Sequence, residues 1–175
     1  MAQEIELEKT YLAKYLPDDL KSYKYEEMED LYLPKGSAHA RLRIRKKGNI
    51  FCITKKEPVV GQNSSVHTEN TILLNDKEYK AFDNLNGDRI NKKRFNYSYQ
   101  GQNCEIDVFT GKLSGLVLVD FEFSDVKDLI NFKMPDFCLV DVTEEEFIAG
   151  GVLCKSSIKT LKNNLIKFNY KRLLF

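Results

Sequence analysis

The stretch LVLVDFEF, from Leu116 to Phe123, decides how the rest of this sequence is interpreted. It is apolar enough for a central strand of a sheet, yet Asp120 and Glu122 lie two residues apart and share one face of that strand. Carboxylates are rarely buried unless they are paired or bound to a cation. The stretch therefore predicts a strand whose polar face meets positive charge.

The other predicted strands repeat this alternation of charge. A single pair of like charges is most often a solvated sheet face with cross-strand ion pairs, and the pattern alone leaves that interpretation open. If the faces instead lined a closed barrel, its interior would suit a polyanion together with a hard divalent metal ion. Two residues apart on the predicted strands lie Glu6 and Glu8, Arg43 and Arg45, His67 and Glu69, Lys92 and Arg94, and Glu105 and Asp107, and the fourth strand ends with Lys55 and Lys56.

Length and composition predict one soluble globular domain, residues 1–175. The chain has 42% hydrophobic and 30% charged residues, and its 27 basic residues against 26 acidic ones lack the basic excess of a general nucleic-acid binder. Its four cysteines form no C-x-x-C motif, which argues against a zinc site or a disulfide framework. With no apparent signal peptide or membrane span, we expect a cytoplasmic protein.

The alternating segments, in hairpin spacing with three or four helices between them, predict an α+β domain with a mainly antiparallel sheet that closes into a barrel. Asn75 is a predicted N-cap, and Ser124 is predicted to cap a short helix. Thr143 and Glu146 have the spacing of a capping box. A basic amphipathic C-terminal helix is predicted at about 156–172.

Five segments resemble one known superfamily. They are ELEKTY (6–11), RLRIRKKGNIFCITKK (41–56), KKRF (92–95), EIDVFTGKLSGLVLVDFEF (105–123) and VTEEEF (142–147). Together they resemble the CYTH, or triphosphate tunnel metalloenzyme, superfamily over about residues 4–155, and small bacterial inorganic triphosphatases in particular. The resemblance implies a closed tunnel of eight antiparallel strands that binds a triphosphate at its centre.

The resemblance also implies metal-dependent hydrolysis of inorganic tripolyphosphate or an organic triphosphate, with Mg²⁺ or Mn²⁺ as cofactor. Phosphate contacts would come from Arg43, Arg45, Lys56, His67, Lys92 and Arg94. Metal ligands would come from Glu6, Glu8, Glu69, Asp107, Asp120 and Glu122, with Glu6, Glu8 and Lys56 catalytic. The expected partner is a small molecule with a triphosphate group, without nucleic acid or membrane, and the protein would be a monomer or a homodimer.

The sequence departs from the family pattern at three places. Thr10 stands where the family has a lysine, Thr71 stands where a second tunnel carboxylate is expected, and FIAGG (147–151) lacks the usual basic residues. Two alternatives stay open, and Thr10 and Thr71 favour the second. One is a class IV-type adenylate cyclase of the same superfamily, and the other is a non-catalytic module that binds polyphosphate or a nucleotide.

Overall fold

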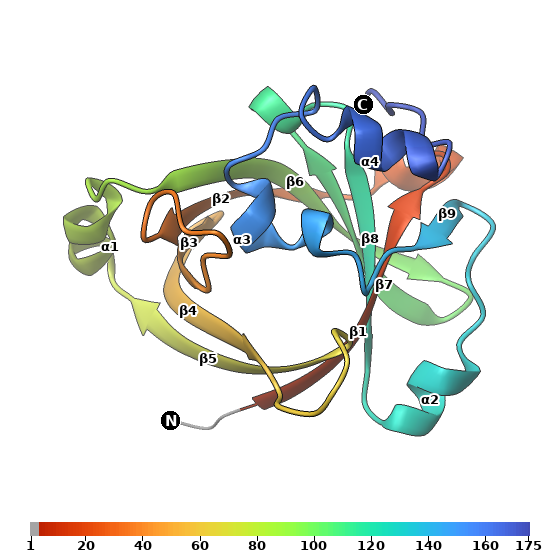
Figure 1. The fold of residues 1–175 in the computed structure, drawn as a ribbon, viewed down its shortest axis with the longest axis horizontal. Helices are drawn as coiled ribbons and strands as arrows, with labels where there is room; N and C mark the ends of the chain where they lie inside the picture. The colour runs from red at the N-terminus through yellow and green to blue at the C-terminus, as the bar shows by residue number, and fades with distance from the viewer. Residues whose placement is uncertain (1–3) are drawn as a thin grey trace.

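The computed structural model describes residues 4–175, which form a strongly curved antiparallel sheet that closes on itself (Figure 1). The strands are β1 (Glu4–Ala13), β2 (Tyr25–Leu33), β3 (Leu42–Lys47), β4 (Ile50–Pro58), β5 (Val66–Leu74), β6 (Asp88–Tyr99), β7 (Gln102–Phe109), β8 (Val117–Phe123) and β9 (Cys138–Asp141). Their order is β5-β4-β3-β2-β6-β7-β8-β1-β9, and β5 also pairs with β1. The predicted closed barrel of eight antiparallel strands is confirmed, and β9 is an addition at its edge.

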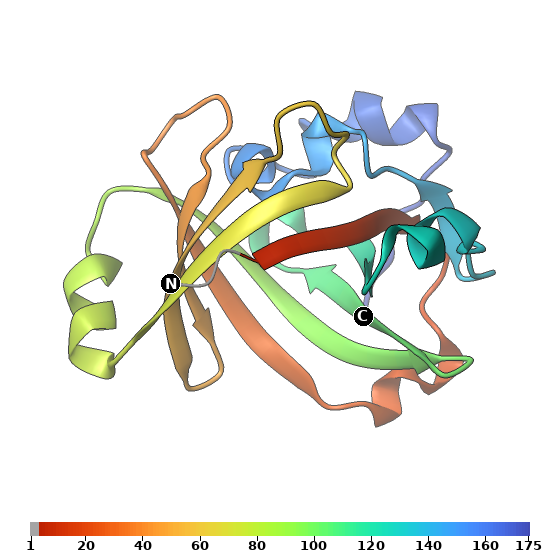
Figure 2. The same cartoon turned by 90° about the horizontal axis from the view of Figure 1, so that it is seen from below.

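The barrel closes at β1, whose two edges pair with three other strands. One edge of β1 pairs with β8, and the other pairs first with β5 and then with β9. Figure 2 shows β1 and β5 side by side along this seam. Between the β5 and β9 pairings, the amide of Glu8 donates to the carbonyl of Ser65 (3.0 Å), and that of Thr10 donates to Thr143 Oγ1 (3.1 Å). The strand that carries Glu6 and Glu8 is therefore hydrogen-bonded along both edges.

The structure confirms one of the predicted helix caps and corrects another. Asn75 caps α1 (Asp76–Asp83) and forms a capping box with Glu78, as its sequence position predicts. The helix α2 (Val126–Asn131) is capped by Asp125, whose carboxylate accepts from the amide of Asp128, so the prediction of Ser124 as cap was wrong by one residue. An aspartate beside the serine supplies the stronger, charged acceptor for the helix N-terminus.

Thr143 does not begin a helix, contrary to its predicted capping box. Its hydroxyl donates to Asp141 Oδ1 (2.6 Å) and accepts from the amide of Thr10, so the side chain serves the seam of the barrel instead. The helical turns nearby come later, as the 3₁₀ turn η3 (Glu146–Ile148) and the short helix α3 (Gly150–Leu153). Two further 3₁₀ turns are η1 (Asp18–Ser22) and η2 (Gly111–Leu113).

The C-terminal helix is far shorter than the predicted 156–172. Only α4 (Lys162–Lys167) is α-helical. Ser157 and Thr160 hydrogen-bond to each other's backbone and form a local turn before α4, and Asn169 has a positive φ of 55° that ends it. The apolar stripe still packs on the barrel, because Leu161 and Leu165 are buried in the core there.

One end of the barrel interior is apolar and the remainder is charged. At the apolar end, Leu12, Ile90, Phe109 and Leu118 pack with Leu153 of α3 in one core cluster. Figure 1 shows α3 across this part of the opening, with α4 beyond it. Two residues further along each of these strands, the side chain that faces the cavity is polar or charged: Thr10 on β1, Lys92 on β6, Asp107 on β7 and Asp120 on β8. No helix within residues 4–175 has the length and apolar character needed to cross a membrane.

Candidate functional site

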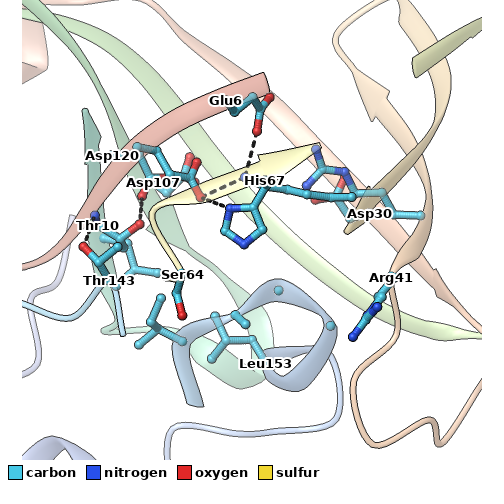
Figure 3. A pocket seen from close by; sticks show the side chains of 18 of the residues that line it. Glu6, Thr10, Asp30, Arg41, Ser64, His67, Asp107, Asp120, Thr143 and Leu153 are labelled. Carbon is cyan, nitrogen blue, oxygen red and sulfur yellow. Dashed lines mark hydrogen bonds and ion pairs between the residues drawn. The ribbon is translucent and has the colours of Figure 1, made fainter. Parts of the chain in front are cut away.

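The inward-facing side chains enclose a cavity of about 660 Å³ inside the barrel (Figure 3). A volume of this size falls in the range of sites for small molecules. Every residue predicted from the sequence to belong to the site lines this cavity: Glu6, Glu8, Arg43, Arg45, Lys56, His67, Glu69, Lys92, Arg94, Asp107, Asp120 and Glu122. The period of two along each strand brings them together, because alternate residues face the same side.

The charges of the cavity are segregated into two walls. The cationic wall, on β4, β3 and β6, consists of Lys56, Arg43, Arg45, Lys92 and Arg94. The acidic wall, on the neighbouring strands β7, β8 and β1, consists of Glu105, Asp107, Asp120, Glu122, Glu6 and Glu8. A cavity with one basic and one acidic side can bind phosphate oxygens on the first and cations on the second.

Asp30 of β2 is a site residue that sequence reasoning missed. Its carboxylate accepts from Arg45 Nε (2.6 Å) and Nη2 (2.8 Å), and the residue is only 2% exposed. Burial alone would raise the pKa of Asp30, but the Arg45 guanidinium holds it well below its usual range. The available signal was its spacing, since Asp30 lies in phase with the apolar residues Met28 and Tyr32.

Asp107 of β7 is a buried counter-ion for the cations of β6, as Asp30 is for Arg45. It accepts from Arg94 Nε (2.7 Å) and Nη2 (2.6 Å), and Lys92 also donates to it. These two cations hold the pKa of Asp107 well below its usual range although burial opposes this. Burial and the nearby Arg94 charge lower the pKa of Lys92. Asp107 thus fixes two phosphate-binding candidates, and its predicted contact with metal stays a prediction.

Lys56 contacts both glutamates of β1. Its Nζ lies 2.8 Å from Glu6 Oε2 and 2.8 Å from Glu8 Oε1. Burial would raise the pKa of Glu8, and Lys56 outweighs this effect, so that the pKa is lowered. His67 Nδ1 lies 3.8 Å from Glu8 Oε1 and has no hydrogen-bond partner among residues 4–175, and Figure 3 shows the ring directed into the cavity. Burial and the Lys56 charge lower the pKa of His67, which favours the neutral imidazole.

Glu69 and Thr71 form a smaller group on β5. Arg43 Nη2 lies 3.3 Å from Glu69 Oε2, and the Thr71 hydroxyl donates to Glu69 Oε1 (2.9 Å). Thr71 therefore supports the tunnel carboxylate that precedes it instead of supplying a second one. Burial opposes the charge of Arg43, yet the neighbouring Tyr32 and Asp30 raise its pKa, so the guanidinium stays protonated.

The acidic wall carries more negative charge than its neighbours neutralise. Burial raises the pKa of Asp120 to about 7, with further contributions from Asp107 and Glu8. Burial and the nearby Glu105 also raise the pKa of Glu122, which lies directly opposite Glu8 in the β1–β8 pair. Like charges at such short range repel strongly in a partly buried site.

Thr10 lies at the centre of this crowding. It is 6% exposed, and its hydroxyl donates to Asp120 Oδ1 at 2.7 Å (Figure 3). A lysine at this position would add a positive charge beside Asp120, whereas the threonine supplies one neutral hydrogen bond. Because of this departure from the family pattern, the acidic wall lacks the positive charge that a lysine would supply.

The donors of the acidic wall fit a hard divalent cation. Carboxylate oxygens are the ligands that Mg²⁺ and Mn²⁺ prefer, and the pKa values of Asp120 and Glu122 are raised by burial and by the neighbouring carboxylates. Within residues 4–175, however, no three His, Cys, Asp or Glu side chains lie close enough together to hold a metal as they stand. Glu6 and Glu8 are bound by Lys56, and Glu105 by Arg94.

A second feature that the sequence did not reveal lies at the rim of the cavity. Ser64 donates to Glu144 from its amide (3.0 Å) and from its hydroxyl (3.1 Å), which joins the β4–β5 loop to the segment after β9. On the other side of this segment, His39 Nδ1 lies 3.8 Å from Glu146 Oε1. The glutamates of TEEEF are thus rim residues and not helix caps.

Comparison with known proteins supports the fold. No family model and no curated protein matches the sequence. Among solved structures, the inorganic triphosphatase NE1496 is 25% identical with a TM-score of 0.63, covering 86% of this chain and 95% of the other. These findings confirm the CYTH superfamily resemblance.

Two further solved structures share this fold. A conserved hypothetical protein from Pyrococcus furiosus is 26% identical with a TM-score of 0.50, over 71% of this chain and 85% of the other. A candidate adenylate cyclase from Bacillus halodurans covers 100% of this chain and 95% of its own with a TM-score of 0.55, but only 15% identity. The latter supports the tunnel fold alone and does not distinguish hydrolysis from cyclisation.

Proposed function

We propose that this chain is a metal-dependent triphosphatase that hydrolyses inorganic tripolyphosphate or an organic triphosphate inside its tunnel. The observation that carries the proposal is the pair of opposed walls, cationic on β4, β3 and β6 and acidic on β7, β8 and β1, around one cavity. The similarity to an inorganic triphosphatase supports the same reaction class.

The cationic wall would bind the phosphate chain. Arg43, Arg45, Lys92 and Arg94 supply donors that match phosphate oxygens, and arginine can do so in bidentate fashion. Two of these guanidinium groups are already held by the buried Asp30 and Asp107. Because they are fixed before the substrate enters, little reorganisation is needed as negative charge develops on the phosphate chain. His67 would add a phosphate contact, as its position in the cavity allows.

The acidic wall would hold Mg²⁺ or Mn²⁺. Glu122 and Asp120 are the principal candidates, with Glu6 and Glu8 beside them and Glu69 and Asp107 as further predicted ligands. The bound cation would offset charge on the phosphate oxygens and lower the pKa of a coordinated water. Glu6 and Glu8 would orient the attacking water and accept its proton.

The chemistry would be a displacement at the terminal phosphorus. The water oxygen forms a bond to phosphorus while the bond to the bridging oxygen breaks, and that oxygen leaves with the remaining diphosphate. Lys56 and Arg94 would stabilise the charge that develops on the leaving oxygen. This assignment gives each wall a separate part in the reaction.

One assay set tests the proposal. The full chain is incubated with tripolyphosphate or ATP, with Mg²⁺ or Mn²⁺, and phosphate and cyclic AMP are measured. We expect metal-dependent phosphate release that Glu122→Gln reduces by at least about a hundredfold, the scale of losing one key charged group from such a site. Cyclic AMP as product would favour the cyclase alternative, and binding without turnover would favour the binding module. Full metal-dependent activity of Glu122→Gln would refute the metal assignment.

A further inference from the structure

Lys56 bridges the two walls of the cavity. It comes from β4, where its register partner on β5 is Glu69, yet its ammonium group contacts Glu6 and Glu8 of β1 at 2.8 Å each. Glu69 pairs with Arg43 instead. One lysine of the phosphate-binding side therefore neutralises two carboxylates of the metal-binding side.

The other strong ion pairs of the cavity are less able to open. Arg45 and Arg94 are held by Asp30 and Asp107, each only 2% exposed. Opening such a pair would leave an uncompensated charge in a buried position, which is strongly unfavourable. The side chains of Lys56, Glu6 and Glu8 keep 24%, 26% and 20% of their surface exposed, so each can be solvated or bind a ligand when they separate.

We infer that Lys56 is an exchangeable counter-ion that makes divalent-cation binding and triphosphate binding depend on each other; this rests on the proposed function. In the structure, Glu6 and Glu8 are neutralised by the lysine. When these carboxylates bind a divalent cation they release the ammonium group, because two cations repel at this range. The released Lys56 then contacts the phosphate chain. Each ligand thus raises the affinity for the other, and by the same factor in both directions.

The positions of the acidic side chains agree with this exchange. Glu8 lies opposite Glu122 in the strand register, the pair that could share a cation, yet its carboxylate is bound to Lys56. Across residues 4–175, no cluster of three metal-ligating side chains is already assembled. These contacts are the ones expected if Lys56 and a divalent cation compete for the same carboxylates.

Direct binding of Mn²⁺ to the full chain, without any phosphate, tests the inference by calorimetry. Deleting a phosphate ligand should leave the affinity for the metal alone unchanged, whereas deleting a competing counter-ion should raise it. We expect Lys56→Met to bind Mn²⁺ about tenfold more tightly than the wild type, within the usual range of coupling between two sites. Lys56→Arg keeps the charge and should bind Mn²⁺ like the wild type.

Lys55→Met is the matched control. Lys55 is adjacent on β4, its side chain is 54% exposed, and it pairs with Glu57 at 3.4 Å, so the variant removes the same formal charge from the opposite face of the strand. Its affinity for Mn²⁺ should stay within about twofold of the wild type, because an exposed charge is screened by solvent and salt. An equal gain in Lys55→Met would mean a general field effect and would overturn the exchange.

A second titration measures binding of bis-methylene triphosphate, an analogue that resists hydrolysis. It is carried out once with EDTA and once with Mn²⁺, and the affinities are corrected for the metal that the anion binds in solution. In the wild type, Mn²⁺ should tighten binding of this anion about tenfold, and Lys56→Met should lose most of that gain. Unchanged or weaker Mn²⁺ binding by a folded Lys56→Met would overturn the inference, and Lys56→Gln replaces it if thermal unfolding shows misfolding. Neither titration requires turnover, so an inactive wild type would refute the proposed function without deciding this result.

Discussion

Removal of the Asp30 carboxylate should destabilise the fold by an amount that the geometry allows us to estimate. Asp30 is 2% exposed and accepts two hydrogen bonds from Arg45 at 2.6 and 2.8 Å. Breaking a buried pair by removing one partner costs about 3–5 kcal/mol, because the other charge stays buried. The Arg45 side chain keeps 12% exposure toward the cavity, so water can solvate it in part. We therefore expect Asp30→Asn to lower the free energy of unfolding by about 3 kcal/mol.

Urea unfolding followed by circular dichroism would measure this loss, and the melting temperature should fall by roughly 6–12 °C for a chain of this size. The double variant Asp30→Leu, Arg45→Met is the decisive comparison. It replaces both charges with apolar groups and should recover most of the stability, because no charge is left uncompensated. A loss below about 1 kcal/mol in Asp30→Asn, or a double variant less stable than the single one, would refute the assignment of Asp30 as a buried counter-ion.

Three further outcomes can be checked. The depressed pKa of Asp30 means that its pair stabilises the fold above about pH 4 and that this stability is lost as the pH falls through the folded-state pKa; acid titration should therefore weaken the wild type more than the double variant. Gly151→Ala should lower the melting temperature, since a Cβ there would lie 1.9 Å from the carbonyl oxygen of Ala40, and overpacking costs about 1–3 kcal/mol; an unchanged melting temperature would contradict this tight packing of α3. Residues 147–175 carry six basic and no acidic residues; Lys159→Glu with Lys162→Glu should slow tripolyphosphate association at low salt in stopped-flow measurements, and the difference should vanish at high salt.

Which side chains line the cavity could be predicted from the sequence because the relevant rule is local. Alternate residues of a strand face the same side, so a pair such as Arg43 and Arg45 must share its face with whatever that strand covers. Closure of the sheet then places all such faces around one interior. Asp30 escaped the prediction because its nearest neighbours on the same face, Met28 and Tyr32, are uncharged, so it forms no pair of like charges two residues apart.

Helix extents were harder to predict because the competing contacts are not local. Thr143 has the spacing of a helix cap, but the amide of Thr10 on β1 lies within 3.1 Å of its hydroxyl and needs an acceptor at the seam of the barrel. The stripe around Leu161 and Leu165 correctly identifies the residues that pack on the barrel. It does not determine how many of the neighbouring residues are helical, because short polar turns satisfy the same packing.

The pairing of individual charges depends on strand order, which the charge pattern does not contain. Arg45 meets Asp30, and Arg94 meets Asp107, because their strands are neighbours and these residues are in register. Lys56 is an exception, because it contacts Glu6 of β1 and not its register partner Glu69 on β5. This contact is possible only because β5 pairs with β1 and closes the barrel. The contact that most affects how the site would bind metal and phosphate is therefore a consequence of closure.

Thr10 shows how the same closure changes the meaning of a substitution. Judged from the sequence alone, Thr10 replaces the lysine that the family pattern has, which suggests weaker binding of an anion. In the structure its neighbour is Asp120, a carboxylate already crowded by Asp107 and Glu8, so a lysine here would add positive charge beside the acidic wall. The threonine keeps Asp120 hydrogen-bonded without neutralising it, which leaves more negative charge available to a divalent cation. Read with the Lys56 contacts, the departure makes the acidic wall more dependent on added cations, and Thr10→Lys should accordingly weaken Mn²⁺ binding in the same titration that tests the exchange.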